Sequence, residues 1–325
     1  MEIFIQIVIL LIGLLLILFG ANYLVDGASS IAKKFGLSEF VIGLTIVGIG
    51  TSAPEMVVSF LSSFQGKSDM AVGNIVGSNI FNTMMILGAT ALISPLVITK
   101  NNLKRDIPLN IAVTILLIVL GMNMTIFNIG DADSLSRIDG AIMLSIFAWY
   151  MWRSFANDSS TNQEAENIGD SIVVRGGLIS TVMIVGGLAA LVSGGRLFVD
   201  SATEIAKIFG VSDKFIAITV MAAGTSMPEL ATCIVAALKG RGQLALGNIL
   251  GSNISNILLI LGGAALINPL SFSGMSSIDF AAVLTSAIFI FLSVFLFKKK
   301  TLDRTEGALL LLMEAGYMWY LIANL

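Results

Sequence analysis

Long apolar stretches recur along the whole chain, and each is long enough to cross the hydrocarbon core of a bilayer, for which an α-helix needs about 20 residues. Hydrophobic residues make up 56% of the 325 positions and charged residues 12%, with a mean hydropathy of +0.94, so no room remains for a soluble domain. The sequence therefore predicts an all-α integral membrane protein with ten transmembrane helices. We place these helices at residues 3–25, 39–64, 70–93, 107–126, 138–155, 174–198, 213–238, 243–267, 278–297 and 305–323.

The second half of the sequence repeats the first. Adding 174 to a residue number aligns GIGTSAPE at 48–55 with AAGTSMPE at 222–229, and GNIVGSNIFN at 73–82 with GNILGSNISN at 247–256, without a gap. Each half holds five predicted spans, an odd number, so the second half must enter the membrane upside down, as in many secondary transporters. We divide the chain into a first five-helix repeat at 1–155, a polar, acidic cytoplasmic linker at 156–173, and a second, inverted five-helix repeat at 174–325.

Each repeat places one glutamate, Glu55 or Glu229, directly after a proline inside an apolar stretch. A charged side chain at the centre of a bilayer helix costs about 2.5 kcal/mol or more, and the predicted helix cores hold no lysine or arginine to offset it. We therefore predict that the two carboxylates converge on a bound cation. A purely structural role is the less favoured alternative.

The prolines before these glutamates, Pro54 and Pro228, have no N–H to complete a helical turn. We expect each helix to open over the four residues at 48–51 and 222–225, leaving backbone carbonyls without helical partners. Carbonyl and carboxylate oxygens together are the ligands of hard cations such as Ca²⁺ and Na⁺. The carbonyls concerned are those of Gly48, Gly50, Thr51, Ala222, Gly224 and Thr225.

Neutral polar residues spaced by four lie on one face of each companion helix. We favour a place in the cation site for Ser78, Asn82, Ser252 and Asn256, which continue the face nearest the glutamates. For the remaining asparagines, hydrogen bonding between helices is an open alternative. These are Asn74, Asn79, Asn248 and Asn253.

Several other residues suggest chemistry but are interpreted as structural. Cys233, the single cysteine, replaces Ser59 of the first repeat and is expected to be a small core residue. Glu314 is mid-helix, but its counterpart lies near Phe147, so we expect a protonated carboxyl at a helix interface rather than a pathway residue. The acidic loop at 131–139 lacks the spacing of an EF-hand, and helix capping is the favoured interpretation.

Basic residues set the expected orientation, because cytoplasmic loops are enriched in Lys and Arg. With both termini outside, thirteen basic residues fall in cytoplasmic segments and five in external ones. We therefore expect an integral protein of the prokaryotic cell (inner) membrane with both termini outside. The cytoplasmic group comprises Lys33, Lys34, Lys100, Lys104, Arg105, Arg153, Arg175, Lys239, Arg241, Lys298, Lys299, Lys300 and Arg304.

GTSAPE and GTSMPE, each followed by GNIxGSNIxN, resemble the two alpha-repeats of the sodium/calcium exchanger family within the calcium/cation antiporters. The resemblance spans nearly the entire chain. It implies that the first and sixth helices slide against the rest to switch access. Asn82 and Asn256 depart from relatives that carry aspartate there, which argues against a dependence on potassium. The resemblance further implies a Ca²⁺ site at the carboxylates of Glu55 and Glu229 and the carbonyls of Thr51 and Thr225, and Na⁺ sites at Ser52, Ser226, Ser78, Ser252 and the carbonyls of Gly48 and Ala222.

The expected function is therefore exchange of Ca²⁺ for Na⁺ by alternating access, with these ions and membrane lipid as partners, no cofactor, no nucleic acid, and a design that can work as a monomer. A proton-coupled divalent cation antiporter using the same two glutamates is the alternative. A channel would need a continuous pore. An intramembrane hydrolase using Ser52 or Ser226 is disfavoured, because the sequence has no histidine and its predicted helix cores have no lysine to act as a general base.

Overall fold

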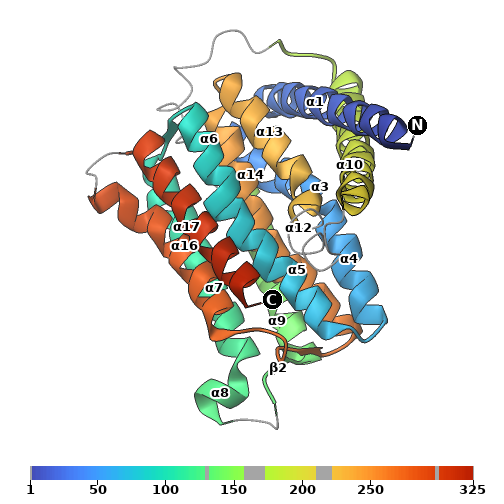
Figure 1. Ribbon diagram of the computed structural model, residues 1–325. Helices are drawn as coiled ribbons and strands as arrows, with labels where there is room; N and C mark the ends of the chain where they lie inside the picture. The colour runs from blue at the N-terminus through green and yellow to red at the C-terminus, as the bar shows by residue number, and fades with distance from the viewer. Residues whose placement is uncertain (1, 129–131, 157–172, 210–221, 297–299, 325) are drawn as a thin grey trace.

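The computed structural model describes residues 2–128, 132–156, 173–209, 222–296 and 300–324, and Figure 1 shows their arrangement. The first half contains α1 (Glu2–Phe35), α2 (Glu39–Ile42), η1 (Gly43–Val47), α3 (Gly48–Thr51), α4 (Ala53–Phe64), α5 (Ser68–Phe81), η2 (Asn82–Ile86), α6 (Leu87–Ile93), η3 (Asn102–Asp106), α7 (Ile107–Gly121), α8 (Asn123–Phe127) and α9 (Arg137–Ala156). The second contains α10 (Gly177–Ile208), α12 (Ala222–Thr225), α13 (Met227–Leu238), α14 (Gly242–Ser255), η7 (Asn256–Leu261), α15 (Gly262–Ile267), α16 (Ser277–Leu296) and α17 (Arg304–Ala323).

The predicted apolar spans are helical over most of their described residues, with short breaks such as those at Ser52 and Ser226 and a later start of the sixth span at Gly177, which confirms a helical membrane protein. By length and composition, five described helical stretches can cross a membrane, and the bent unit α2–α4 makes a sixth. The predicted end of the first helix at residue 25 is wrong, because α1 continues to Phe35. It ends only where Gly36 adopts a positive φ of 65° and the Leu37 N–H donates to the Ala32 carbonyl, a common helix terminus.

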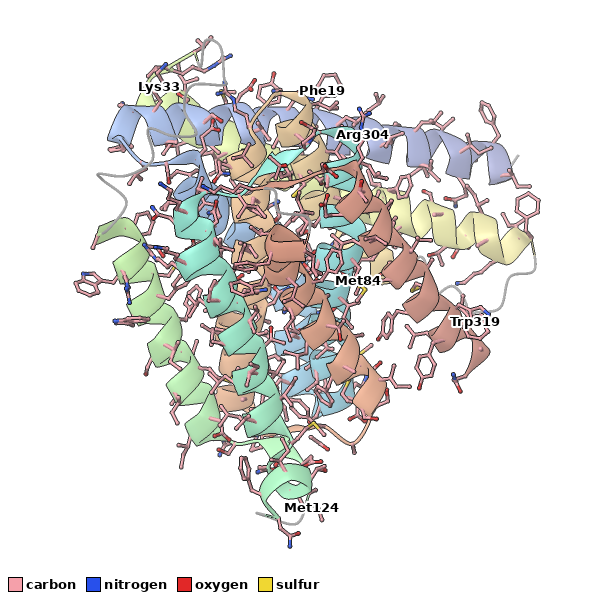
Figure 2. All side chains as sticks on the ribbon, turned by 90° about the vertical axis from the view of Figure 1, so that its left-hand side faces the viewer. Phe19, Lys33, Met84, Met124, Arg304 and Trp319 are labelled. Carbon is pink, nitrogen blue, oxygen red and sulfur yellow. The ribbon has the colours of Figure 1, made fainter. Side chains whose placement is uncertain are left out.

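Helices α1 and α10 pack tightly against each other along much of their length. Their contact is built on small residues spaced by seven: a Cβ added at Gly20 would lie 2.7 Å from the Gly187 carbonyl oxygen, and one at Gly13 would lie 2.8 Å from that of Gly194. At 34 residues, α1 is about 50 Å long, well beyond the hydrocarbon thickness of about 30 Å. The pair therefore crosses the bundle at a steep angle, as Figures 1 and 2 show.

The centre of the bundle is formed by two continuous helical stretches, α5–η2–α6 and α14–η7–α15, which are largely buried. Each changes to one π-helical turn that begins at an asparagine, Asn82 in η2 and Asn256 in η7. A π-turn widens the helix locally and is often found at functional sites. The helices α4 and α13 flank this pair and bring Glu55 and Glu229 to it.

Two short sheets join the halves at opposite ends of the bundle. β1 (Leu96–Val97) pairs with β4 (Thr301–Leu302), and β2 (Ser134–Leu135) pairs with β3 (Leu270–Ser271), all antiparallel. The prediction of a gapless offset is wrong for the last helix of each half. Helices α9 and α17 are related by 304 − 137 = 167 rather than 174, because the connection between α7 and α9 (residues 122–136) is longer than that between α16 and α17 (residues 297–303).

Candidate functional site

Each glutamate lies in the first turn of a helix that follows a break. Ser52 separates α3 from α4 with φ −77° and ψ 11°, and Ser226 separates α12 from α13 with φ −90° and ψ 7°. The first break bends the segment by 49°. Helix N-termini favour negative charge, so both carboxylates occupy the ends where the helix dipole stabilises an anion.

The predicted opening over residues 48–51 is wrong in detail, because Gly48–Thr51 remain helical and the chain departs from the helix only at Ser52. The Ser52 N–H still donates to the Gly48 carbonyl at 3.2 Å. The physical reason is that Pro54 removes only its own N–H, the donor to Gly50, so the turn before the break stays intact.

The two glutamates are linked crosswise through serines of the opposite half. Ser52 Oγ donates to Glu229 Oε1 at 3.0 Å, and Ser226 Oγ donates to Glu55 Oε1 at 3.2 Å. All four side chains are fully buried. The structure therefore brings together the two acidic residues that the sequence places 174 positions apart.

The companion serines are arranged differently in the two halves. Ser78 Oγ donates to Glu55 Oε1 at 3.3 Å and lies 3.3 Å from Ser226 Oγ. Its counterpart Ser252 donates to the Gly48 carbonyl at 3.1 Å instead. All the predicted serines are thus in or beside the site, in contact with either a carboxylate or a backbone carbonyl.

The predicted threonines border the glutamates. Thr51 Oγ1 donates to Asn248 Oδ1 at 3.1 Å, and its hydroxyl faces Glu229, whereas the Thr225 hydroxyl faces Glu55. Ala222 begins α12, directly after residues 210–221, which lie outside the described residues.

Two further asparagines, Asn79 and Asn253, hold the predicted site asparagines in place. Asn256 Nδ2 donates to Asn79 Oδ1 at 3.0 Å, and Asn82 Nδ2 donates to Asn253 Oδ1 at 3.2 Å, so each bond crosses between the halves. Asn79 Nδ2 also donates to the Asn253 carbonyl at 3.1 Å. Sequence reasoning left these two residues as open alternatives, and their signal was the repeated asparagine in both GSNI motifs.

This arrangement uses the amide donors and leaves acceptor oxygens free. Among the described residues, four buried oxygens around the glutamates have no hydrogen-bond partner: Oε2 of Glu55, Oε2 of Glu229, Oδ1 of Asn82 and Oδ1 of Asn256. All four residues have zero exposure. Buried acceptors without partners are costly, and carboxylate and amide oxygens are the kinds of ligand that a hard cation prefers.

The residues interpreted as structural lie apart from this oxygen cluster or serve packing. Cys233 is fully buried and accepts from Asn248 Nδ2 at 3.2 Å. Glu314 is 6% exposed and makes no hydrogen bond to the cluster among the described residues. Asp139 caps α9 by accepting from the Ser136 N–H at 2.8 Å, which confirms helix capping at that end of the acidic loop.

Comparison with known proteins identifies the family. The family model "sodium/calcium exchanger protein" matches residues 5–156 and 179–323. The chain belongs to the sodium/calcium exchanger family. It is 34% identical over 338 residues to the sodium/calcium exchanger MaX1 of Methanosarcina acetivorans, covering 95% of this chain and 96% of that one. It is also 35% identical over 263 residues to the inner membrane protein YrbG of Escherichia coli, covering 80% of this chain and 79% of that one.

A solved structure agrees with the same family. The sodium–calcium exchanger NCX_Mj, soaked without Na⁺ and Ca²⁺, has a TM-score of 0.82 and 31% sequence identity, with 99% of each chain covered. The recognised family and the expected class of cation antiporter are therefore confirmed. This exchanger-family chain is an integral membrane transporter.

Proposed function

We propose that this chain exchanges Ca²⁺ for Na⁺ by alternating access at the cluster of Glu55, Glu229, Asn82 and Asn256. The observation that carries the proposal is the set of four buried oxygens without hydrogen-bond partners. Two are carboxylate oxygens and two are amide oxygens, a mixture typical of Ca²⁺ and Na⁺ ligands. The hydroxyls of the surrounding serines and the carbonyls near each break would complete the coordination.

Charge supports an obligatory exchange. When ionised, the two glutamates carry two negative charges in a buried place, where Coulomb repulsion is much larger than in water. One Ca²⁺ or several Na⁺ would neutralise them, and the described part of the bundle offers no Lys or Arg bound to either carboxylate. An empty site therefore resists the conformational change, and only loaded states cross readily.

The proposed membrane arrangement is ten spans in two inverted five-helix repeats, with the 156–173 linker in the cytoplasm and both termini outside. The sheet pairing supports it. Leu96 of the first half pairs with Leu302 at one end of the bundle, and its repeat counterpart Leu270 (96 + 174 = 270) pairs with Leu135 at the other end, as expected for inverted halves. Figure 2 shows Lys33 and Arg304 towards one end of the bundle and Met124 at the opposite end, as the charge bias requires.

A proton-coupled antiporter using the same glutamates is the second candidate. Oε2 of Glu55 and Oε2 of Glu229 accept no hydrogen bond among the described residues, so either position can hold a proton in place of Na⁺. Asn82 and Asn256 add no further carboxylate, and we infer that the cycle needs no potassium.

The test is ⁴⁵Ca²⁺ uptake into proteoliposomes under imposed Na⁺, H⁺ or K⁺ gradients. We expect uptake driven by an outward Na⁺ gradient alone, and loss of that uptake in Glu55→Gln and in Glu229→Gln. Glu314→Gln is the matched control, because it neutralises a buried mid-helix carboxyl with no bond to the cluster and should retain uptake. Uptake driven by a pH gradient but not by Na⁺ would establish the second candidate instead.

Uptake near the parent level in both glutamate variants would refute the site. A flux that persists without any counter-ion would indicate a channel rather than an exchanger.

A further inference from the structure

The two halves differ in how the long helices cover the helices that carry the glutamates. Helix α13 packs against α14, α6 and η2, and α4 packs against their repeat counterparts α5, α15 and η7. Helix α1 adds an extensive contact with α13, and Figure 1 shows it lying across the end of α13. In the part of the chain that the structure describes, α10 makes no extended contact with α4.

Side-chain exposure follows this difference. Val235 on α13 is 6% exposed, whereas Leu61, its counterpart on α4 (61 + 174 = 235), is 54% exposed. Beyond the neighbours that it shares with α4, α13 contacts both α1 and α10, and the contact with α1 is the more extensive, so most of the extra cover on α13 comes from α1. Among the described residues, α1 therefore covers the end of α13, and no long helix covers the corresponding end of α4 in the same way.

An ion pair lies on the closed contact. Lys239, directly after α13, has its Nζ 2.6 Å from Asp26 Oδ1 of α1 and 3.4 Å from the Asn22 carbonyl oxygen. The corresponding positions in the other half are Asp200 and Gln65 (26 + 174 = 200; 239 − 174 = 65). The acidic partner is repeated but the basic partner is not, so α10 and α4 cannot form the same ion pair.

We propose that Asp26 and Lys239 form a one-sided latch that positions α1 against α13 and biases the exchanger towards the conformation in which this end is closed. The inference rests on the proposed alternating access, in which the α1–α10 pair moves relative to the glutamate helices. Inverted halves make two mirrored conformations comparable in energy, and a contact present in only one of them shifts the balance. Partly exposed ion pairs shift such a balance about two- to fivefold.

Spin-label distance measurements in proteoliposomes test the latch directly. With Cys233→Ser as background, one label pair at Tyr23→Cys and Leu238→Cys reports the closed end. The mirrored pair at Leu197→Cys and Phe64→Cys, each shifted by 174, reports the open end. Tyr23, Leu238 and Phe64 are exposed, which suits labelling.

We expect Lys239→Gln and Asp26→Asn each to increase the long-distance population of the 23–238 pair about two- to fivefold, and the short-distance population of the 197–64 pair in parallel. The charge-exchanged variant Asp26→Lys with Lys239→Asp should restore the parent distributions, which separates the latch from misfolding. Asp200→Asn is the matched control and should change neither pair.

The reverse experiment builds the missing latch. Gln65→Lys should add a short-distance population to the 197–64 pair, and Asp200→Asn should remove that gain. Parent-like distributions in both Lys239→Gln and Asp26→Asn would overturn the latch, as would an equal shift in Asp200→Asn alone.

Exchange measured in the same vesicles distinguishes the two failures. If the parent protein exchanges Ca²⁺ for Na⁺ but the distance distributions do not respond, the latch is wrong and the proposed function stands. If the parent shows no Na⁺-driven exchange, the proposed function fails irrespective of the distances.

Discussion

Replacing Asn79 by leucine should lower the affinity for Ca²⁺ although Asn79 is not one of the residues with a free oxygen. Its Oδ1 accepts from Asn256 Nδ2 at 3.0 Å, and its Nδ2 donates to the Asn253 carbonyl at 3.1 Å. Leucine has a similar size, so the change removes the polar groups with little cavity. The effect then comes from the amide of Asn256, which loses the acceptor that fixes its orientation.

The magnitude follows from the bonds that remain. After the substitution, Asn256 Nδ2 keeps only the contact with Ser78 Oγ at 3.4 Å, which is too long to replace a bond of 3.0 Å. A buried donor without an adequate partner costs about 1–3 kcal/mol. The Asn256 side chain can avoid this cost by rotating its amide group, which turns an N–H instead of Oδ1 towards the cation. A loss of about 1–3 kcal/mol in binding corresponds to an increase of roughly 5- to 150-fold in the half-saturating Ca²⁺ concentration.

The assay is initial ⁴⁵Ca²⁺ uptake against external Ca²⁺ in Na⁺-loaded proteoliposomes, with thermal unfolding in detergent measured alongside. Asn110→Leu is the control, because Asn110 is another fully buried asparagine whose Oδ1 has no partner among the described residues. It should alter stability but not the half-saturating concentration. If Asn79→Leu lowers the unfolding temperature and leaves that concentration unchanged, the positioning argument is refuted and Asn79 only joins helices.

Two further predictions concern the scaffold. Gly20→Ala should lower the unfolding temperature by forcing α1 and α10 apart, at a cost of about 1–3 kcal/mol, because its Cβ would lie 2.7 Å from the Gly187 carbonyl oxygen. Gly186→Ala, where a Cβ would meet nothing within 4 Å, should be neutral or stabilising, and equal effects of the two would contradict the packing argument. At the tip of the first half, the Thr125 hydroxyl and N–H donate to Asp133 and hold the pKa of that carboxyl below its ordinary value. Because this pKa is lowered, the ionised Asp133 stabilises the folded loop above the pKa of the unfolded chain, and this stabilisation is lost as the pH falls through the pKa of the folded loop. Thr125→Val removes one of the two hydrogen bonds and should therefore raise the pKa of Asp133 in an NMR titration. An unchanged titration would refute this explanation.

The sequence predicted which buried polar residues lie together better than it predicted the helix ends. Glu55 and Glu229 were visible because a costly buried carboxylate occurs twice with the same neighbours, whereas Ser52 and Ser226 were implied only by the resemblance of the repeated motifs to the exchanger family. The boundary at residue 25 failed because the helix after Asp26 is buried against α10, with Ser30 hydrogen-bonded to Ser180, so tertiary packing keeps these residues helical beyond the apolar run. The constant offset between the halves failed for the last helix, because the loops that precede α9 and α17 share no sequence pattern from which their different lengths could be predicted.

The roles of Asn79 and Asn253 could not be read from spacing alone. A helical face predicts which residues lie together on one helix, whereas a hydrogen bond from Asn256 to Asn79 depends on how α5 and α14 cross. The π-turns at Asn82 and Asn256 were missed for the same reason, because a change from α to π geometry reflects packing around the turn more than the identity of the residues in it.

By itself, the chain's amino-acid order determined the helical membrane class, the repeat and the identity of the paired acids, since hydrophobicity, proline chemistry and the cost of buried charge act on each segment locally. Tertiary structure alone decided which oxygens are left without donors and which end of the bundle α1 closes. Both depend on contacts between segments far apart in the chain, where a donor satisfied in one helix leaves an acceptor free in another.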